Sequence, residues 1–190
     1  LTNCMFAANS AGKYGGGLYT LEGAPTLTNC TFTNNSGRYG GGGIFNGGGA
    51  PTLTNCTFSG NSGNTGGGMR TTGSAAILNN CTFSANWSSH WGGGMYNEHG
   101  APRLTSCVFT ANWSIDSGGG GMFNYDGYPN LSHCTFTNNS GRYGGGMYNY
   151  SGTPTLANCM FIGNMAGDSG GGMYNRSGSA VLGNCTFSAN

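Results

Sequence analysis

Leu27-Thr28-Asn29-Cys30-Thr31-Phe32-Thr33-Asn34-Asn35 decides the fold, because the whole chain consists of variations on this stretch. The copies begin at Leu1, Leu27, Leu53, Leu78, Leu104, Leu131, Leu156 and Leu182. Each copy contains one cysteine, and successive cysteines are 25 to 27 residues apart. A repeat of this length, held so regularly, is the signature of a solenoid. We therefore expect residues 1–190 to form a single domain of stacked, similar coils.

Each repeat predicts short strands separated by corners. Cys30 and Phe32 alternate with threonines, which is the period-2 pattern of a strand with one buried face. Leu27 and Cys30 are an odd number of residues apart, so in one continuous strand their side chains would point to opposite faces, and both could not face inward. A bend at Thr28-Asn29 resolves this, since asparagine tolerates the left-handed conformation that such a corner requires.

The remainder of the same repeat predicts a polar loop, a glycine run and a further strand. Residues 34–39 are polar, residues 40–43 are all glycine, and Ile44-Phe45-Asn46 is a short stretch followed by more glycines. No segment has the length or the 3.6-residue period of a helix. Two or three strands per coil, stacked about 4.8 Å apart with right-handed crossovers, form a β-helix. The sequence thus predicts an all-β fold, a right-handed parallel β-helix of about seven coils.

Composition narrows the function classes. The formal net charge is +1 and no basic run is present, which argues against nucleic acid or an anionic membrane surface as a partner. No apolar run approaches the roughly 20 residues of a membrane-spanning helix, so we expect no membrane insertion by this segment. The chain begins and ends within a repeat and lacks the polar caps of a solenoid, which favours a segment internal to a longer protein or fibre, or a unit whose ends are covered by neighbours.

Two motifs alternate along the whole chain: Phe-x-x-Asn, as in Phe32 to Asn35, and Gly-Gly-Gly-aliphatic, as in Gly92-Gly93-Gly94-Met95. This alternation resembles the repeats of chlamydial polymorphic outer-membrane proteins and, more widely, bacterial surface proteins with right-handed β-helix repeats. The chlamydial repeats usually have alanine as the third residue of the second motif, where this chain always has glycine. The resemblance implies an exported passenger, extracellular or on the cell surface, with an adhesive or structural role.

The cysteine column is open to two interpretations. Its members are Cys4, Cys30, Cys56, Cys81, Cys107, Cys134, Cys159 and Cys185. Stacked residues have Cα atoms within disulfide range, but their parallel Cβ atoms stay further apart than the about 3.8 Å that a bridge prefers. One cysteine per coil also differs from the C-x-x-C spacing of a zinc site. We expect a ladder of buried free thiols, with disulfides between adjacent coils as the alternative.

An asparagine follows each cysteine by five residues. This unbroken column comprises Asn9, Asn35, Asn61, Asn86, Asn112, Asn139, Asn164 and Asn190. A ligand site would combine asparagine with carboxylates, whereas amides that bond to one another and to the backbone need only asparagine. We therefore expect a structural ladder.

Two sets of aromatic residues are candidates for binding. The residue after each glycine run is predicted to form a further interior column, the aliphatic column: Leu18, Ile44, Met69, Met95, Met122, Met147 and Met173. The next residue in each coil then points outward: Tyr19, Phe45, Tyr96, Phe123, Tyr148 and Tyr174, with Arg70 in the third coil. An exposed strip of this kind suits packing against another rod, and the alternative is that glycine-rich loops cover it. The second set is Trp87, His90, Trp91 and Trp113, expected in one loop region. There the indoles would stack on sugar rings or form a local hydrophobic cap.

Two further patterns suggest less favoured functions. Outward threonines flank each inward phenylalanine, which resembles the ice-binding faces of some antifreeze proteins, although Met5, Val108 and Met160 interrupt the ladder. Asp116 and Asp168 share a column position roughly 10 Å apart, near the upper limit for an inverting glycosidase pair. Arg142 in the coil between them is more simply a surface ion-pair partner.

These observations favour a structural, self-associating β-helix rod of an extracellular fibre or cell-surface protein, with other copies of the chain as partners. The alternative is an adhesin or glycan-binding passenger that contacts glycans or the surface of a host or neighbouring cell. An ice-binding protein and a polysaccharide-active enzyme are less favoured. We expect no enzymatic activity, no catalytic residue, no cofactor and no metal.

Overall fold

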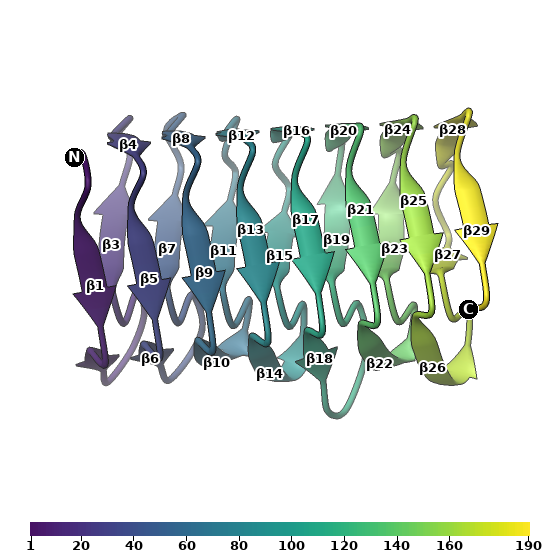
Figure 1. Cartoon of the computed structure of the whole chain (residues 1–190), viewed down its shortest axis with the longest axis horizontal. Helices are drawn as coiled ribbons and strands as arrows, with labels where there is room; N and C mark the ends of the chain where they lie inside the picture. Colours follow the sequence, from purple (N-terminus) through teal and green to yellow (C-terminus); the bar gives the residue numbers. More distant parts are fainter.

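The computed structural model describes all 190 residues and contains 29 short strands and no helix. The coils stack along one axis, so that the chain runs from the N-terminus at one end of the rod to the C-terminus at the other (Figure 1). Every pairing between strands is parallel, and four sheets run the length of the rod. This confirms the predicted all-β parallel solenoid of about seven coils. Without a helix, the chain has no helical segment that could cross a membrane.

The two sheets that hold the opening stretch are named here after their inward residues. The Leu sheet comprises β4 (Thr26–Thr28), β8 (Thr52–Thr54), β12 (Ile77–Asn79), β16 (Arg103–Thr105), β20 (Asn130–Ser132), β24 (Thr155–Ala157) and β28 (Val181–Gly183). The Phe sheet comprises β1 (Met5–Ala7), β5 (Thr31–Thr33), β9 (Thr57–Ser59), β13 (Thr82–Ser84), β17 (Val108–Thr110), β21 (Thr135–Thr137), β25 (Met160–Ile162) and β29 (Thr186–Ser188).

The other two sheets lie before and after the glycine run. The corner sheet comprises β2 (Ser10–Ala11), β6 (Ser36–Gly37), β10 (Ser62–Thr65), β14 (Trp87–Trp91), β18 (Trp113–Ser114), β22 (Ser140–Tyr143) and β26 (Met165–Ser169). The Met sheet comprises β3 (Leu18–Leu21), β7 (Ile44–Gly47), β11 (Met69–Thr72), β15 (Met95–Glu98), β19 (Met122–Gly127), β23 (Met147–Gly152) and β27 (Met173–Arg176).

Each coil thus has four strands, not the two or three predicted. The additional strands form the corner sheet, where the sequence predicts a polar loop. Ser36 and Gly37 pair with Ser62 and Gly63 of the next coil, although neither residue type favours strands. Pairing with the coils above and below explains this. In the sheet the backbone N–H and C=O groups bond to the neighbouring coils, whereas in a loop they would bond to water.

The corner before each phenylalanine strand is built as the sequence predicts. Asn29 has φ of 51°, and Asn55 and Asn80 adopt the same left-handed conformation at 53° and 52°. The side-chain amide of Asn55 donates to Oδ1 of Asn29 at 3.2 Å, so the corner is also joined to its neighbour. The bend lets Leu27 and Cys30 both face the interior, although they are an odd number of residues apart.

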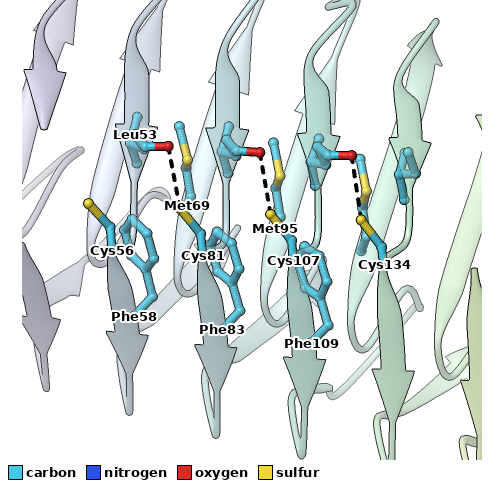
Figure 2. Close-up of a cluster of buried hydrophobic side chains, with 14 of the residues drawn as sticks. Leu53, Cys56, Phe58, Met69, Cys81, Phe83, Met95, Cys107, Phe109 and Cys134 are labelled. Atoms are coloured by element: carbon cyan, nitrogen blue, oxygen red, sulfur yellow. Dashed lines mark hydrogen bonds between the residues drawn. The ribbon is translucent and has the colours of Figure 1, made fainter. Parts of the chain in front are cut away.

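The interior consists of the four predicted apolar columns: leucine, cysteine, phenylalanine and the residue after the glycine run (Figure 2). The last of these is Leu18, Ile44, Met69, Met95, Met122, Met147 and Met173. From Phe6 to Phe187 the phenyl rings form one continuous stack, with centroids 4.6 to 5.0 Å apart and planes within 7°. Such offset stacking adds to the hydrophobic burial that holds the coils together.

The cysteines are free thiols, buried in six coils and half-buried at Cys4 and Cys185. The thiol of Cys107 donates to the carbonyl oxygen of Leu78 in the preceding coil at 3.5 Å, and Cys81 does the same to Leu53 at 3.7 Å (Figure 2). Of the two interpretations of this column, the structure has free thiols. Contact with the neighbouring thiol and burial raise the pKa of Cys107, which keeps the thiol protonated.

The glycine run is fixed by close packing between coils. Gly92 has φ of +65°, a left-handed turn that glycine adopts without strain. A Cβ on Gly94 would lie 2.5 Å from the carbonyl oxygen of Gly121 and 3.0 Å from Cδ1 of Phe109. The phenylalanine stack therefore occupies the space that an alanine at the third position would need. This explains why the third residue of the motif is glycine in every coil.

Two columns of polar side chains accompany the apolar core. Asn35, Asn61, Asn86, Asn112, Asn139 and Asn164 are fully buried, and each side-chain amide donates to Oδ1 of the next asparagine at 2.9 to 3.0 Å. A second amide ladder, not predicted, lies on the Met sheet. There Asn97 donates to Asn124 at 2.7 Å, and Asn124 donates to Asn149 at 2.6 Å. The signal for it was an asparagine or threonine two residues after each aliphatic residue.

Candidate functional site

The outer face of the Met sheet carries a ring column in exact register from coil to coil. Its members are Tyr19, Phe45, Arg70, Tyr96, Phe123, Tyr148 and Tyr174. Apart from Arg70, these are the residues predicted to form an exposed strip for self-association. They point outward, as alternation requires, because their neighbours on both sides in each strand face the interior.

The ring column is not exposed in the central coils. Tyr96, Phe123 and Tyr148 are only 5%, 3% and 5% accessible. The rings cover one another along the axis, with centroids of Tyr96 and Phe123 5.4 Å apart and those of Phe123 and Tyr148 4.8 Å apart. Exposure rises toward the ends of the column: Tyr19 in the first coil is half exposed, and Tyr174 in the seventh is partly exposed. Of the two alternatives, the structure shows the covered strip, and rings from the same face, rather than glycine-rich loops, do the covering.

Arg70 continues the ring column instead of interrupting it. Its guanidinium lies between two rings, 5.6 Å from the centroid of Phe45 and 5.2 Å from that of Tyr96. Nη2 also donates to Oε2 of Glu98 at 2.8 Å. A planar cation stacks on aromatic faces as another ring would, so the column stays continuous through the third coil.

A groove of about 530 Å³ opens beside the ring column between the fourth and seventh coils. One side is formed by Trp91 and Tyr143, which occupy equivalent positions two coils apart, with Gly118 in the coil between them. The other side is formed by the residues two positions beyond the ring column: Glu98, Tyr125, Tyr150 and Arg176. Its volume and aromatic lining lie in the range of small-ligand sites.

The groove has few charges, and they are not equivalent. Glu98 is paired with Arg70 and also accepts a hydrogen bond from Oγ1 of Thr72 at 3.1 Å. Arg176 lies over the ring of Tyr150 at 5.4 Å and has no carboxylate of this chain within 4 Å. Burial, followed by the charge of Glu98, raises the pKa of Tyr96, and burial also raises the pKa of Tyr148. These phenols therefore stay neutral hydrogen-bond donors at neutral pH.

The four residues expected in one loop region are divided between two faces. Trp87, His90 and Trp91 lie in strand β14, and Trp113 lies in β18. Trp87 and Trp113 are paired in register and stack 6.4 Å apart on the outer face of the corner sheet. Trp91, four residues after Trp87, instead contacts Phe123 at 5.8 Å on the Met sheet. Sequence proximity placed the three indoles together, but the turn from one sheet to the next separates Trp91 from the other two.

The carboxylates lie beside separate basic residues rather than in one cluster. Asp168 lies 3.5 Å from Nε of Arg142, whereas Asp116 lies 3.8 Å from Nε2 of His90. The backbone N–H of Asp116 donates to the carbonyl oxygen of Ser89, which places Asp116 opposite His90 of the preceding coil. No group of three or more histidine, cysteine or acidic side chains is arranged to hold a metal ion.

The outward threonines lie in register on the Phe sheet, where Thr31 pairs with Thr57 and Thr57 with Thr82. The columns are interrupted where Val108 and Met160 take threonine positions. The longest run in this column is therefore three threonines.

The parallel coils and their outward aromatic groove define a β-helix repeat protein. A family profile described as right-handed β-helix region matches residues 1–126, about two thirds of the chain, and the chain therefore belongs to the right-handed β-helix family. This agrees with the predicted hand of the coils. Comparison with curated proteins and with solved structures finds no significant match.

Proposed function

We propose that this chain is a structural, non-enzymatic β-helix segment of an extracellular fibre or cell-surface protein. The observation that carries the proposal is the continuity of the ladders: the phenylalanine stack runs from Phe6 to Phe187 without a break. A cross-section repeated so closely makes a stiff rod, and little of its surface varies between coils. The resemblance of the repeats to those of chlamydial surface proteins supports export.

The rod has an exposed apolar patch that suits contact with a second copy. Trp113, Ile115 and Met165 are all exposed on this side of the rod. Ile115 and Met165 line a shallow depression together with Arg142 and Asp168, and Trp113 is paired with Ser140, which also lines it. Exposed apolar patches of this kind mark interaction sites. Because the ring column is covered, this corner-sheet patch replaces it as the surface proposed for lateral self-association.

The test combines sedimentation velocity at rising protein concentration with negative-stain electron microscopy. The proposal expects rods that bundle or lengthen, and it expects Trp113→Ala combined with Met165→Ser to reduce association. Trp91→Ala, which removes an indole from the other face, is the matched control and should leave association unchanged. A monomer at every concentration would contradict the self-associating part of the proposal.

A second candidate function is glycan binding, as an adhesin or passenger module that contacts glycans or another cell surface. The specific observation that favours it is the aromatic groove, since rings with polar groups at their edges are suited to stacking on sugars. A glycan array probed with the full chain tests this function. Binding to one or more glycans would support glycan binding, and binding to none would contradict it. Ice binding receives less support, because the threonine columns are interrupted.

A further inference from the structure

The sulfur atoms of the cysteine column repeat with the spacing of the coils. For all eight cysteines, Sγ lies 3.4 to 3.5 Å from the carbonyl oxygen two residues earlier. From Cys30 onward, Sγ also lies 3.5 to 3.7 Å from the carbonyl oxygen of the leucine in the preceding coil (Figure 2). Because these contacts are the same in each coil, neighbouring sulfur atoms are separated by the coil spacing of about 4.8 Å.

The gap between two neighbouring sulfur atoms has the length of a linear metal site. A metal–thiolate bond is about 2.3 Å long, so an ion that joins two thiolates in a straight line needs them about 4.6 Å apart. The phenyl centroids of the adjoining column, which measure the coil spacing inside the core, are 4.6 to 5.0 Å apart. Linear bonding to two thiolates is typical of soft ions with a filled d shell, such as Hg(II), Ag(I) and Cu(I).

The number of ligands in each gap excludes harder ions. Zn(II) takes four ligands in a tetrahedron, and no group of three or more histidine, cysteine or acidic side chains is arranged around one point. Each gap between neighbouring coils instead offers two thiols. The column therefore suits an ion that is complete with two ligands.

Burial selects among the two-coordinate ions by charge. The column lies in the core among leucine, phenylalanine and methionine side chains, where a net charge is costly. Two thiolates that hold Ag(I) or Cu(I) keep one negative charge, whereas two thiolates that hold Hg(II) are neutral. The exchange transfers no electron, because the ion replaces two thiol protons, which leave to the solvent. The carbonyl oxygen of Leu78, 3.5 Å from Sγ of Cys107, then lies beside a cation instead of a thiol proton.

We propose that the cysteine column binds soft divalent ions of the Hg(II) type, with each ion joining the thiolates of two neighbouring coils in a straight line. A thiolate shared by two such ions would leave positive charge in the core, so each thiolate serves one ion. The eight cysteines therefore hold four ions. This site is independent of both candidate functions and lies inside the rod, not on its surface.

The test counts bound ions by native mass spectrometry. HgCl2 is supplied to the folded chain and, in a parallel sample, during refolding from urea, because six of the thiols are buried. EDTA then removes ions held by oxygen or nitrogen ligands. The parent chain should retain four Hg(II), and each should displace two protons. ZnCl2 is the matched control, and no Zn(II) should remain after EDTA.

Two double variants distinguish pairing of neighbours from binding at single thiols. Both variants keep six cysteines. Cys56→Ala with Cys81→Ala leaves runs of two and four neighbouring cysteines, which should hold three ions. Cys56→Ala with Cys107→Ala leaves runs of two, one and three, which should hold two ions. Circular dichroism verifies that the coils are intact.

The outcomes that would overturn the proposal are distinct. Equal capacity of the two double variants, or one ion for each cysteine, would overturn the pairing of neighbouring coils. X-ray absorption of the loaded parent chain needs no variant and should show two sulfur ligands at about 2.3 Å. Three or more sulfur ligands would overturn the linear site. A parent chain that retains no Hg(II), or that retains Zn(II) equally well, would overturn the site itself.

Discussion

Oδ1 of Asn164 accepts two hydrogen bonds from Asn139, one from its backbone N–H at 3.1 Å and one from its side-chain amide at 2.9 Å. The same amide also donates to the carbonyl oxygen of Phe109, 2.9 Å away. Each asparagine of this ladder thus joins three coils. Since the side chains are fully buried, these bonds replace water that cannot reach the polar groups.

Removal of one member of this ladder should be costly. Asn139→Ala removes the bond to the carbonyl oxygen of Phe109 and leaves the buried backbone N–H of Asn112 without its acceptor, and the free energy of unfolding should fall by about 3 kcal/mol or more. The adjacent Asn138 is exposed, and its position is occupied by Ala85 and Ala111 in other coils. Asn138→Ala is therefore the matched control, expected to change stability by less than about 1 kcal/mol. Urea denaturation measures both, and equal losses would contradict the buried ladder.

The glycine run should not tolerate a methyl group. Gly94→Ala would place a Cβ against the backbone of Gly121 and the ring of Phe109, and we expect a loss of about 3 kcal/mol. Gly167 has open space around its Cβ position and no positive φ. Gly167→Ala should therefore increase the free energy of unfolding by about 0.5 kcal/mol and raise the melting temperature slightly. Thermal unfolding compares the two variants. A Gly94→Ala variant as stable as the parent chain would contradict the close packing between coils.

The cysteines should be reduced and protected. In native buffer without reductant, a thiol reagent should reach only the half-buried Cys4 and Cys185, because the other six thiols are buried and out of its reach. In denaturant, still without reductant, all eight should react. Fewer than eight in the denatured chain would indicate disulfides and contradict the free-thiol column.

Arg70 should resist conservative replacement. Arg70→Lys keeps the charge but loses the planar contact with Phe45 and Tyr96, so stability should fall by about 1–2 kcal/mol. Arg103→Lys, at an exposed position, should change stability by less than about 0.5 kcal/mol. Chemical denaturation at low and high salt would measure both. A fully tolerated Arg70→Lys would show that the stacking contributes little.

Stability should decline at alkaline pH. Burial and then the charge of Glu98 raise the pKa of Tyr96 above the value of about 10 in the unfolded chain. The folded state therefore holds this proton more tightly, and its stabilising effect is complete below about pH 10 and lost as the pH rises further. Tyr96→Phe should give a shallower fall of the unfolding free energy between pH 10 and 11. Identical slopes in the variant and the parent chain would contradict the assignment.

The regular part of the molecule was largely predictable because it depends on spacing alone. The inward direction of Leu27, Cys30 and Phe32 follows from the repeat and from the alternation of side chains along a strand. The left-handed corner at Asn29 follows because the odd spacing between Leu27 and Cys30 cannot bring both inward without a bend. The corner sheet was not predictable from Ser36 and Gly37, because their strand conformation comes from pairing between coils and not from propensity.

The groove was less predictable because it depends on contacts between residues of different columns. Alternation correctly turns Phe123 outward, but its burial results from the neighbouring rings Tyr96 and Tyr148 and from Trp91, which belongs to a strand of another sheet. The three tryptophans differ in face because Trp91 lies at the end of β14, next to the glycine run that leads into the Met sheet.

Above all, this β-helix is proposed to be a structural element outside the cell. Immunogold electron microscopy of intact, unpermeabilised native cells, with antibodies raised against the 190-residue chain, is the decisive measurement. We expect gold particles on the cell surface or along extracellular fibres. Label that appears only after permeabilisation, and then inside the cell, would contradict it.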